Sequence, residues 1–119
     1  DYAAAVQTIH QTARKLGAFF ERYDFLMTPT LANPPLLLGA LDMQSDDWLA
    51  YLESLLDEIP FTPLFNATGC PAASLPLAKS SEGLPIGVQV GAPLGREDAI
   101  LRLSGALERE WCWHQRELN

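Results

Sequence analysis

The chain has 119 residues, of which 48% are hydrophobic and 19% charged, and its formal net charge is −7. This composition predicts one packed domain, residues 1–119, with enough apolar side chains for a core. Lys and Arg form no basic cluster, which argues against nucleic acid as a direct partner because phosphate contacts need concentrated positive charge. The longest strongly apolar run, Leu36 to Leu41, is too short to cross a bilayer, so no membrane contact is expected.

The cysteines and histidines give no sign of a metal site or a disulfide framework. Cys70 and Cys112 lack metal-ligand spacing, and free, reduced thiols are typical of a cytosolic protein. His10 and His114 lie on different predicted helices without Asp or Cys at ligand spacing. No basic segment followed by an apolar one opens the chain, so no secretory signal is visible. We therefore expect a cytoplasmic protein that needs neither a metal nor a cofactor.

Residues 2–20 carry a hydrophobic period typical of an amphipathic helix. Its apolar side chains fall three and four residues apart and would form one buried stripe. They are Val6, Ile9, Ala13, Leu16 and Phe20. Burying this stripe against a sheet would contribute roughly 1.5–3 kcal/mol for each large side chain, before entropy costs. A polar break follows, and residues 25–28 then predict a short buried strand that Pro29 ends.

A second helix is expected after an ordered, proline-rich loop at residues 31–42. Ser45 is the predicted N-cap, and Asp46 and Asp47 would occupy the first turn, where the helix dipole favours negative charge. The predicted buried face consists of Trp48, Leu52, Leu55 and Ile59. Pro60 would end this helix because proline lacks the amide donor that a helix interior needs.

The remaining elements are two strands and a final helix. The strands are predicted at residues 72–77 and 85–90, joined by a turn-rich connector. The final helix, at about residues 96–110, would bury Ile100, Leu103, Leu107 and Trp111. This order of elements predicts an α/β fold in which a few mixed strands have covering helices. About three strands would leave exposed sheet edges, so we expect the chain to extend a larger sheet.

Two motifs follow each other in the second half of the chain. They are Asn66-Ala67-Thr68-Gly69-Cys70-Pro71 and Gly83-Leu84-Pro85-Ile86-Gly87-Val88-Gln89. Together with Thr28-Pro29-Thr30 they resemble the amidase signature family of hydrolases, and the resemblance covers residues 20–113. It implies that the chain is the C-terminal part of the amidase signature fold, with the remainder of that domain as its partner. A homodimer is a further assembly that we leave open.

The resemblance also implies a hydrolase of small-molecule amides whose catalytic residues lie upstream of this chain. The family cleaves a C–N bond with a nucleophilic serine, a second serine in a cis peptide and a lysine. The serine hydroxyl needs a proton acceptor, and a neutral lysine relayed through another hydroxyl can serve. Lys79-Ser80-Ser81 has these residue types, but adjacent residues in a turn cannot hold the lysine on the serine. No catalytic residue is therefore expected here, and the chain should be inactive by itself.

Six residues are candidates for the wall of the substrate pocket, because the resemblance implies that their segments reach the cleft. They are Thr28, Thr30, Ile59, Phe61, Asn66 and Cys70. Structural roles compete at these positions. The threonines can satisfy backbone groups next to a proline, and Asn66 can shape a tight bend through its side chain. Cys70 can be a small buried apolar residue.

Gln89 stands between Val88 and Val90, so an alternating strand places it on the opposite face from both. Its amide is then either solvated or hydrogen-bonded at an interface. The resemblance favours the buried, hydrogen-bonded state.

Ile59 bears on which branch of the family this chain resembles. Transamidation subunits that use glutamine typically carry an acid three residues before the threonine that precedes the Asn-x-x-Gly loop. Here Thr62 is that threonine and Ile59 takes the acid's place, so a substrate amino group finds no charge partner. Plain amidases, including those that open cyclic amides such as aminohexanoate dimers, are the closer match, and Phe61 and Phe65 would suit an apolar acyl chain. The alternatives are a non-catalytic scaffold module and a tRNA amidotransferase A-type subunit.

Overall fold

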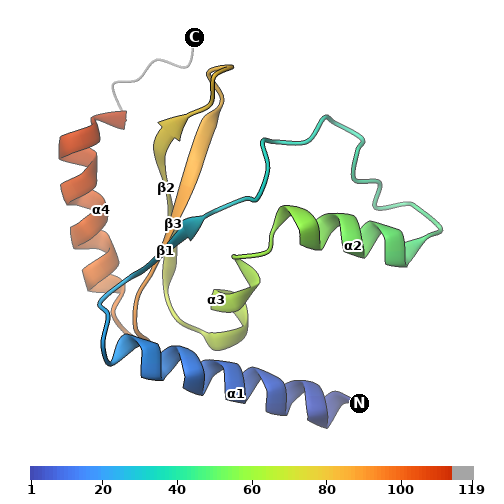
Figure 1. Ribbon diagram of the computed structural model, residues 1–119, viewed down its shortest axis with the longest axis horizontal. Helices are drawn as coiled ribbons and strands as arrows, with labels where there is room; N and C mark the ends of the chain where they lie inside the picture. The colour runs from blue at the N-terminus through green and yellow to red at the C-terminus, as the bar shows by residue number, and fades with distance from the viewer. Residues whose placement is uncertain (114–119) are drawn as a thin grey trace.

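The computed structural model describes residues 1–113, and within them the chain forms four helices and a three-stranded sheet (Figure 1). In chain order the elements are α1 (Tyr2–Phe20), β1 (Leu26–Pro29), α2 (Trp48–Glu58), α3 (Pro63–Thr68), β2 (Ala72–Lys79), β3 (Pro85–Gly91) and α4 (Glu97–Trp111). All of them except α3 were predicted, with boundaries that differ by a few residues. His114, the second histidine considered above, lies outside the described residues.

The sheet has the order β1-β3-β2, and β3 pairs antiparallel with both neighbours. The strands expected as a mixed set are therefore all antiparallel within the described chain. One further backbone bond continues the β1–β3 pairing, since the Thr30 amide donates to the Gly87 carbonyl at 3.0 Å. The pairing of β2 with β3 shifts register between Leu75 and Ala78, where β2 carries an irregularity.

Side-chain alternation divides this sheet into two faces of different chemistry. The apolar face is formed by Ala73, Leu75, Val88 and Val90. The polar face is formed by Thr28, Ser74, Gly87, Gln89 and Gly91. Ala73 pairs with Val90 and Leu75 with Val88 on the apolar face, and Ser74 pairs with Gln89 on the polar face.

The apolar face carries the core. α4 lies beside β2 and packs against it, as Figure 1 shows. Val90 is fully buried, and Leu75 and Ile100 of α4 are buried with it. The predicted stripe of α4 is only partly correct: Leu103 and Leu107 are half-buried, but Trp111 is 45% exposed because it stands at the helix end.

The polar face is filled at one end by Phe65 of α3, whose ring lies directly on Gly91. A Cβ atom at Gly91 would overlap this ring, so only glycine permits the contact. α1 packs against α3 and buries Leu16. The α1 stripe that we expected to lie against a sheet therefore contacts α3, and Ile9 of this stripe is exposed.

The helix ends correct two further predictions. α2 is capped by Asp47, whose carboxylate accepts from the Ala50 amide at 3.0 Å, and not by Ser45. The Ser45 hydroxyl instead accepts from the Asp47 amide just before the helix, at 3.2 Å. α3 was missed because its segment has the composition of a turn. Pro63 begins this short helix, and Gly69 ends it in the left-handed conformation at φ 73°.

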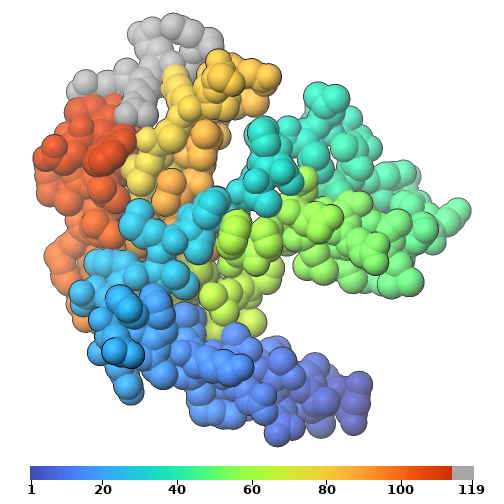
Figure 2. All heavy atoms as spheres, in the orientation of Figure 1, coloured from blue at the N-terminus to red at the C-terminus, as the bar shows by residue number. Residues whose placement is uncertain are grey.

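Residues 31–58, which we call the arm, differ from the rest of the fold. They comprise the loop after β1 and helix α2, and they project away from the sheet (Figures 1 and 2). Every residue from 31 to 40 is exposed, and none of the buried residues of the described chain lies between residues 21 and 64. Leu37, Leu38 and Trp48 are 86%, 104% and 61% exposed. The buried face predicted for α2 is only partly correct: Leu52, Leu55 and Ile59 are half-buried, but Trp48 is exposed and α2 has no fully buried residue.

Candidate functional site

The polar face of the sheet joins two pairs of side chains across strands. The Gln89 amide donates to the Thr28 hydroxyl at 3.1 Å, and Gln89 is only 5% exposed. The predicted buried, hydrogen-bonded state of Gln89 is therefore confirmed. One step further along the strands, the hydroxyls of Thr30 and Ser74 lie 2.6 Å apart. These two pairs line up from the Phe65 end of the face towards the β2–β3 turn.

Gly87 lies directly beneath the second pair. A Cβ atom at this position would stand 2.8 Å from the Ser74 hydroxyl oxygen and 2.8 Å from that of Thr30. No real Cβ contact is that short, so any larger residue would push the two hydroxyls apart. Glycine at this central strand position therefore allows both side chains to settle onto the backbone of β3.

A groove of about 570 Å³ opens above this hydroxyl pair. It runs between the residues that follow β1 and the β2–β3 hairpin, where Figure 2 shows a hollow between the cyan loop and the orange hairpin. Its lining consists of Pro29, Thr30, Leu31, Ala32, Asn33, Pro34, Pro35, Ser74, Pro76, Ser80, Leu84, Pro85, Ile86 and Gly87. None of these residues carries a formal charge, and five are prolines, so the walls are uncharged, mostly apolar and conformationally restricted.

Backbone and side-chain bonds hold the loop that forms one wall of this groove. The Ala32 amide donates to the Glu58 carbonyl at 3.0 Å, and the Asn33 amide group donates to the Glu58 carboxylate at 3.3 Å. The end of α2 thus anchors the wall. Ile59 and Phe61, both predicted pocket residues, follow this anchor directly and are half-buried, but they do not line the groove.

The other predicted site residues are spread over the fold. Thr30 lines the groove. Thr28 does not line it, and its hydroxyl accepts the hydrogen bond from Gln89. Asn66 is exposed within helix α3, so the predicted bend formed by its side chain is wrong. The bend is made by Gly69, which can adopt positive φ without a side-chain clash. Cys70 is half-buried beyond that bend and outside the groove.

Sequence reasoning missed Ser74 and Gly87. Neither was among the six candidates, although Gly87 stands in the second motif, because their role depends on contact with Thr30, 44 residues before Ser74. The only local signal was a small residue in the middle of a strand, which often marks a close approach of other groups. Ser80, by contrast, has the turn role that was expected, since its hydroxyl accepts from the amides of Glu82 and Leu84.

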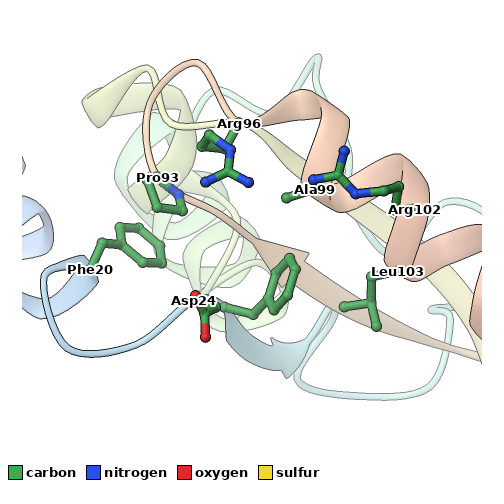
Figure 3. Close-up of a pocket in the computed structure, with 8 residues that line it drawn as sticks. Phe20, Asp24, Pro93, Arg96, Ala99, Arg102 and Leu103 are labelled. Atoms are coloured by element: carbon green, nitrogen blue, oxygen red, sulfur yellow. The ribbon is translucent and has the colours of Figure 1, made fainter.

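A second cavity, of about 470 Å³, lies on the α4 side of the fold and has a different character. Figure 3 shows Arg96 next to Pro93 on the segment before α4, and Arg102 on α4 itself, with Phe20 and Asp24 across from them. Asp98 binds both arginines, at 3.0 Å to Arg96 and 2.6 Å to Arg102. Hydrogen bonds from Arg96 and then Arg102 hold the pKa of Asp98 below its usual value. Both guanidinium groups thus already have the Asp98 carboxylate as a partner.

Metal chemistry finds no support in the residues that the structure describes, since no group of three His, Cys, Asp or Glu side chains is placed to hold an ion. Within the same range, no helix has the length and apolar character needed to cross a bilayer. The polar face therefore offers hydrogen bonding and apolar contact to a ligand, and supplies neither a charged group nor an obvious nucleophile activated by a base.

Comparison with known proteins identifies the relatives of this chain. The family model described as Amidase matches residues 1–101, most of the chain. The chain belongs to the amidase family. Its matched region includes both motifs singled out above, as well as the Thr28-Pro29-Thr30 segment, so the resemblance seen in the sequence is confirmed.

The alignments with named relatives cover nearly all of this chain. A protein of Mycobacterium leprae (strain TN) named AmiC is 38% identical over 109 residues, 92% of this chain. The 6-aminohexanoate-cyclic-dimer hydrolase of Paenarthrobacter ureafaciens is 36% identical over 118 residues, 94% of this chain. These alignments cover 23% and 24% of the two relatives, so the chain spans about a quarter of the length of the curated proteins it matches.

Solved structures show the same relationship for the fold. The structure of 6-aminohexanoate cyclic dimer hydrolase matches 98% of this chain at TM-score 0.88 and 35% identity, using 25% of its own length. A glutamyl-tRNA(Gln) amidotransferase subunit from Thermotoga maritima matches 91% of the chain at TM-score 0.73 and 29% identity, using 22% of its own length. The helices and the antiparallel sheet thus have the arrangement found in one region of amidase-family enzymes, which confirms the predicted fold class.

Proposed function

We propose that this chain forms one wall of the substrate cleft of an amide hydrolase. The remainder of the amidase domain would supply the Ser–cis-Ser–Lys residues upstream, and this chain would supply the polar face and its groove. The match to 6-aminohexanoate cyclic dimer hydrolase at TM-score 0.88 is the observation that carries the proposal. The family match over residues 1–101 supports it independently of the structure.

The proposed chemistry leaves this chain a binding role. A serine hydroxyl of the upstream part attacks the amide carbonyl, the C–N bond breaks, and the amine leaves with a proton. Water then releases the acid from the serine. Groups that hold the substrate in position can lower the barrier as effectively as the reacting groups, because orientation is obtained before reaction. The polar face and the groove would serve this purpose.

An assay of the protein that carries this chain together with the upstream part of the domain tests the proposal. It should hydrolyse a small neutral carboxylic amide, and replacement of the upstream nucleophilic serine by alanine should abolish turnover. This chain without that part should show no activity. Turnover by the isolated chain, or none by the longer protein toward any amide, would contradict the proposal.

A glutamine-dependent transamidation subunit is the second candidate, and the likeness to glutamyl-tRNA(Gln) amidotransferase subunits favours it. Ile59 speaks against it, because an apolar side chain cannot hold the α-amino group of glutamine by charge. Release of ammonia from glutamine, measured beside hydrolysis of a neutral amide, separates the two functions. A cytoplasmic location, a homodimer and a purely structural role stay predictions.

A further inference from the structure

We propose that the groove on the polar face selects an uncharged, aliphatic segment of the amide substrate, and that the Thr30–Ser74 hydroxyl pair is its hydrogen-bonding group. The inference rests on the proposed function, and it names the substrate class and the residues that recognise it. The resemblance identified Thr30 as one of several candidates, whereas Ser74, Gly87 and the groove itself come from the fold.

The charge of the lining is the first argument. The chain as a whole carries 23 charged residues (8 Lys and Arg with 15 Asp and Glu), yet none of them lines the groove. A charged substrate group that enters would lose hydration without gaining a partner, which is costly. Apolar contact with Leu31, Leu84 and Ile86 would instead favour an aliphatic chain. The cavity beside α4 shows the contrast, since two arginines and Asp24 line it.

The hydroxyl pair is the second argument. Thr30 and Ser74 share one hydrogen bond, so one hydroxyl proton is used between them and the other remains for a further acceptor. Among the described residues no other bond to either hydroxyl is found, and both residues line the groove. An amide carbonyl is a matching acceptor. The pair therefore offers a polar contact in a mostly apolar site, the pattern that fixes the orientation of a small ligand.

Gly87 sets the position of this pair. Because no Cβ stands beneath the hydroxyls, both lie against the backbone of β3, and the space above them stays open. Substitution by alanine would force the neighbouring side chains to move by several tenths of an ångström. Such a shift would break the 2.6 Å contact and change the depth of the groove. Gly87 is thus a positioning residue for the pair and touches no substrate itself.

The test uses the protein that carries this chain with the upstream part of the domain, and three amides with one acyl length. They are N-butylhexanamide and its analogues with a terminal carboxylate or a terminal ammonium group. We expect the wild type to cleave the neutral amide with kcat/KM about 10-fold higher than either charged analogue, since desolvation of charge opposes their binding. Ile86→Lys should shift this preference about 10-fold towards the carboxylate analogue.

The second measurement removes the Thr30–Ser74 hydroxyl pair. Thr30→Val combined with Ser74→Ala should lower kcat/KM for N-butylhexanamide about 3–10-fold, the effect of one hydrogen bond between neutral groups. Thr30→Ser combined with Ser74→Thr keeps both hydroxyls and should retain activity. Thr8→Val is the matched control, because its hydroxyl bonds only within α1. Thermal unfolding of each variant shows that a loss of activity does not reflect loss of fold.

Equal kcat/KM for the three amides, or unchanged activity of the Thr30→Val and Ser74→Ala double variant, would overturn the inference. If the wild type cleaves no amide at all, the proposed function fails, but the ligand preference of the groove can still be measured. Calorimetry then measures the binding of uncleaved N-butylhexanamide. Binding that weakens about 3–10-fold in the double variant supports the selective groove, and absence of binding or equal binding refutes it.

Discussion

The two faces of one small sheet differ in their side-chain chemistry. On the apolar face, Val90 and Leu75 are buried together with Ile100 of α4 and form one part of the core. On the polar face, Phe65 covers one end, and beyond it stand hydroxyls, an amide and an open groove. The difference lies in alternate residues of the same strands. A chain that alternates Val88 and Val90 with Gly87, Gln89 and Gly91 thus builds a packed face on one side and, on the other, the polar face that we propose binds substrate.

Stability and function should therefore separate between the two faces. A substitution on the apolar face should change the free energy of unfolding and leave ligand preference alone. A substitution around the hydroxyl pair should do the reverse. Phe65 and Gly91 lie at the junction, because they close the polar face with an apolar contact.

The largest loss of stability is expected from Ile100→Ala. This side chain is 5% exposed, and truncation would leave a cavity between α4 and the sheet. We expect a destabilisation of about 2–5 kcal/mol by urea unfolding of the intact protein. Leu101→Ala is the control on the same helix, since Leu101 is 71% exposed and should change stability by less than about 0.5 kcal/mol. Equal effects at both positions would contradict the assignment of the core.

Gly91→Ala should destabilise the protein by about 1–3 kcal/mol, because the new methyl group meets the ring of Phe65. Gly105→Ala provides the matched control on α4, where the nearest atom to an added Cβ is a flexible Arg109 nitrogen at 3.7 Å. There the same exchange should stabilise the protein by about 0.5–1 kcal/mol through helix propensity. Thermal unfolding of both variants tests the contact, and a neutral Gly91→Ala would argue against it.

Thr28→Val should cost about 1–3 kcal/mol, since it leaves the buried Gln89 amide without its acceptor. The double variant Thr28→Val with Gln89→Leu removes both partners and should recover most of that loss. Denaturant unfolding of the single and double variants measures the coupling. If the double variant is as unstable as the sum of its parts, the hydrogen bond is not what matters at this position.

The smallest effect is expected at Asp98. Its pKa is lowered by Arg96 and Arg102, so its stabilising contribution is present above the pKa of the unfolded state and is lost as pH falls through the lower folded pKa. Asp98→Asn should lower the Tm slightly at neutral pH and reduce its decline on acidification. A Tm profile between about pH 7 and pH 2 measures this, and parallel profiles for variant and wild type would refute it.

Most elements could be predicted from the sequence, because their signals are local. The apolar period of residues 2–20 and the alternation around Gln89 depend only on neighbours along the chain. α3 was missed because a six-residue helix that starts at Pro63 and ends at Gly69 shares its composition with a turn. The exposed arm was also unforeseen, since Trp48 and its neighbours have the period of a buried face, and periodicity does not state what covers it.

The site was less accessible to sequence reasoning because it depends on contacts across strands. Thr30 was among the predicted pocket residues, and Ser74 was not, although the two hydroxyls form one unit. Phe61 and Ile59 were expected at the pocket and follow the anchor of its wall, while Asn66 and Cys70 lie elsewhere. The register of β1, β2 and β3 decides which residues meet. Register between strands that are far apart in the sequence cannot be predicted from a local pattern.

A crystal structure of the intact protein with a neutral amide, N-butylhexanamide on the variant that lacks the upstream nucleophile, tests the binding role of the polar face most directly. We expect the amide group within hydrogen-bond distance of the Thr30 or Ser74 hydroxyl and the acyl chain along Leu31 and Ile86. An amide bound away from the polar face, or a groove filled by another part of the protein, would contradict this role.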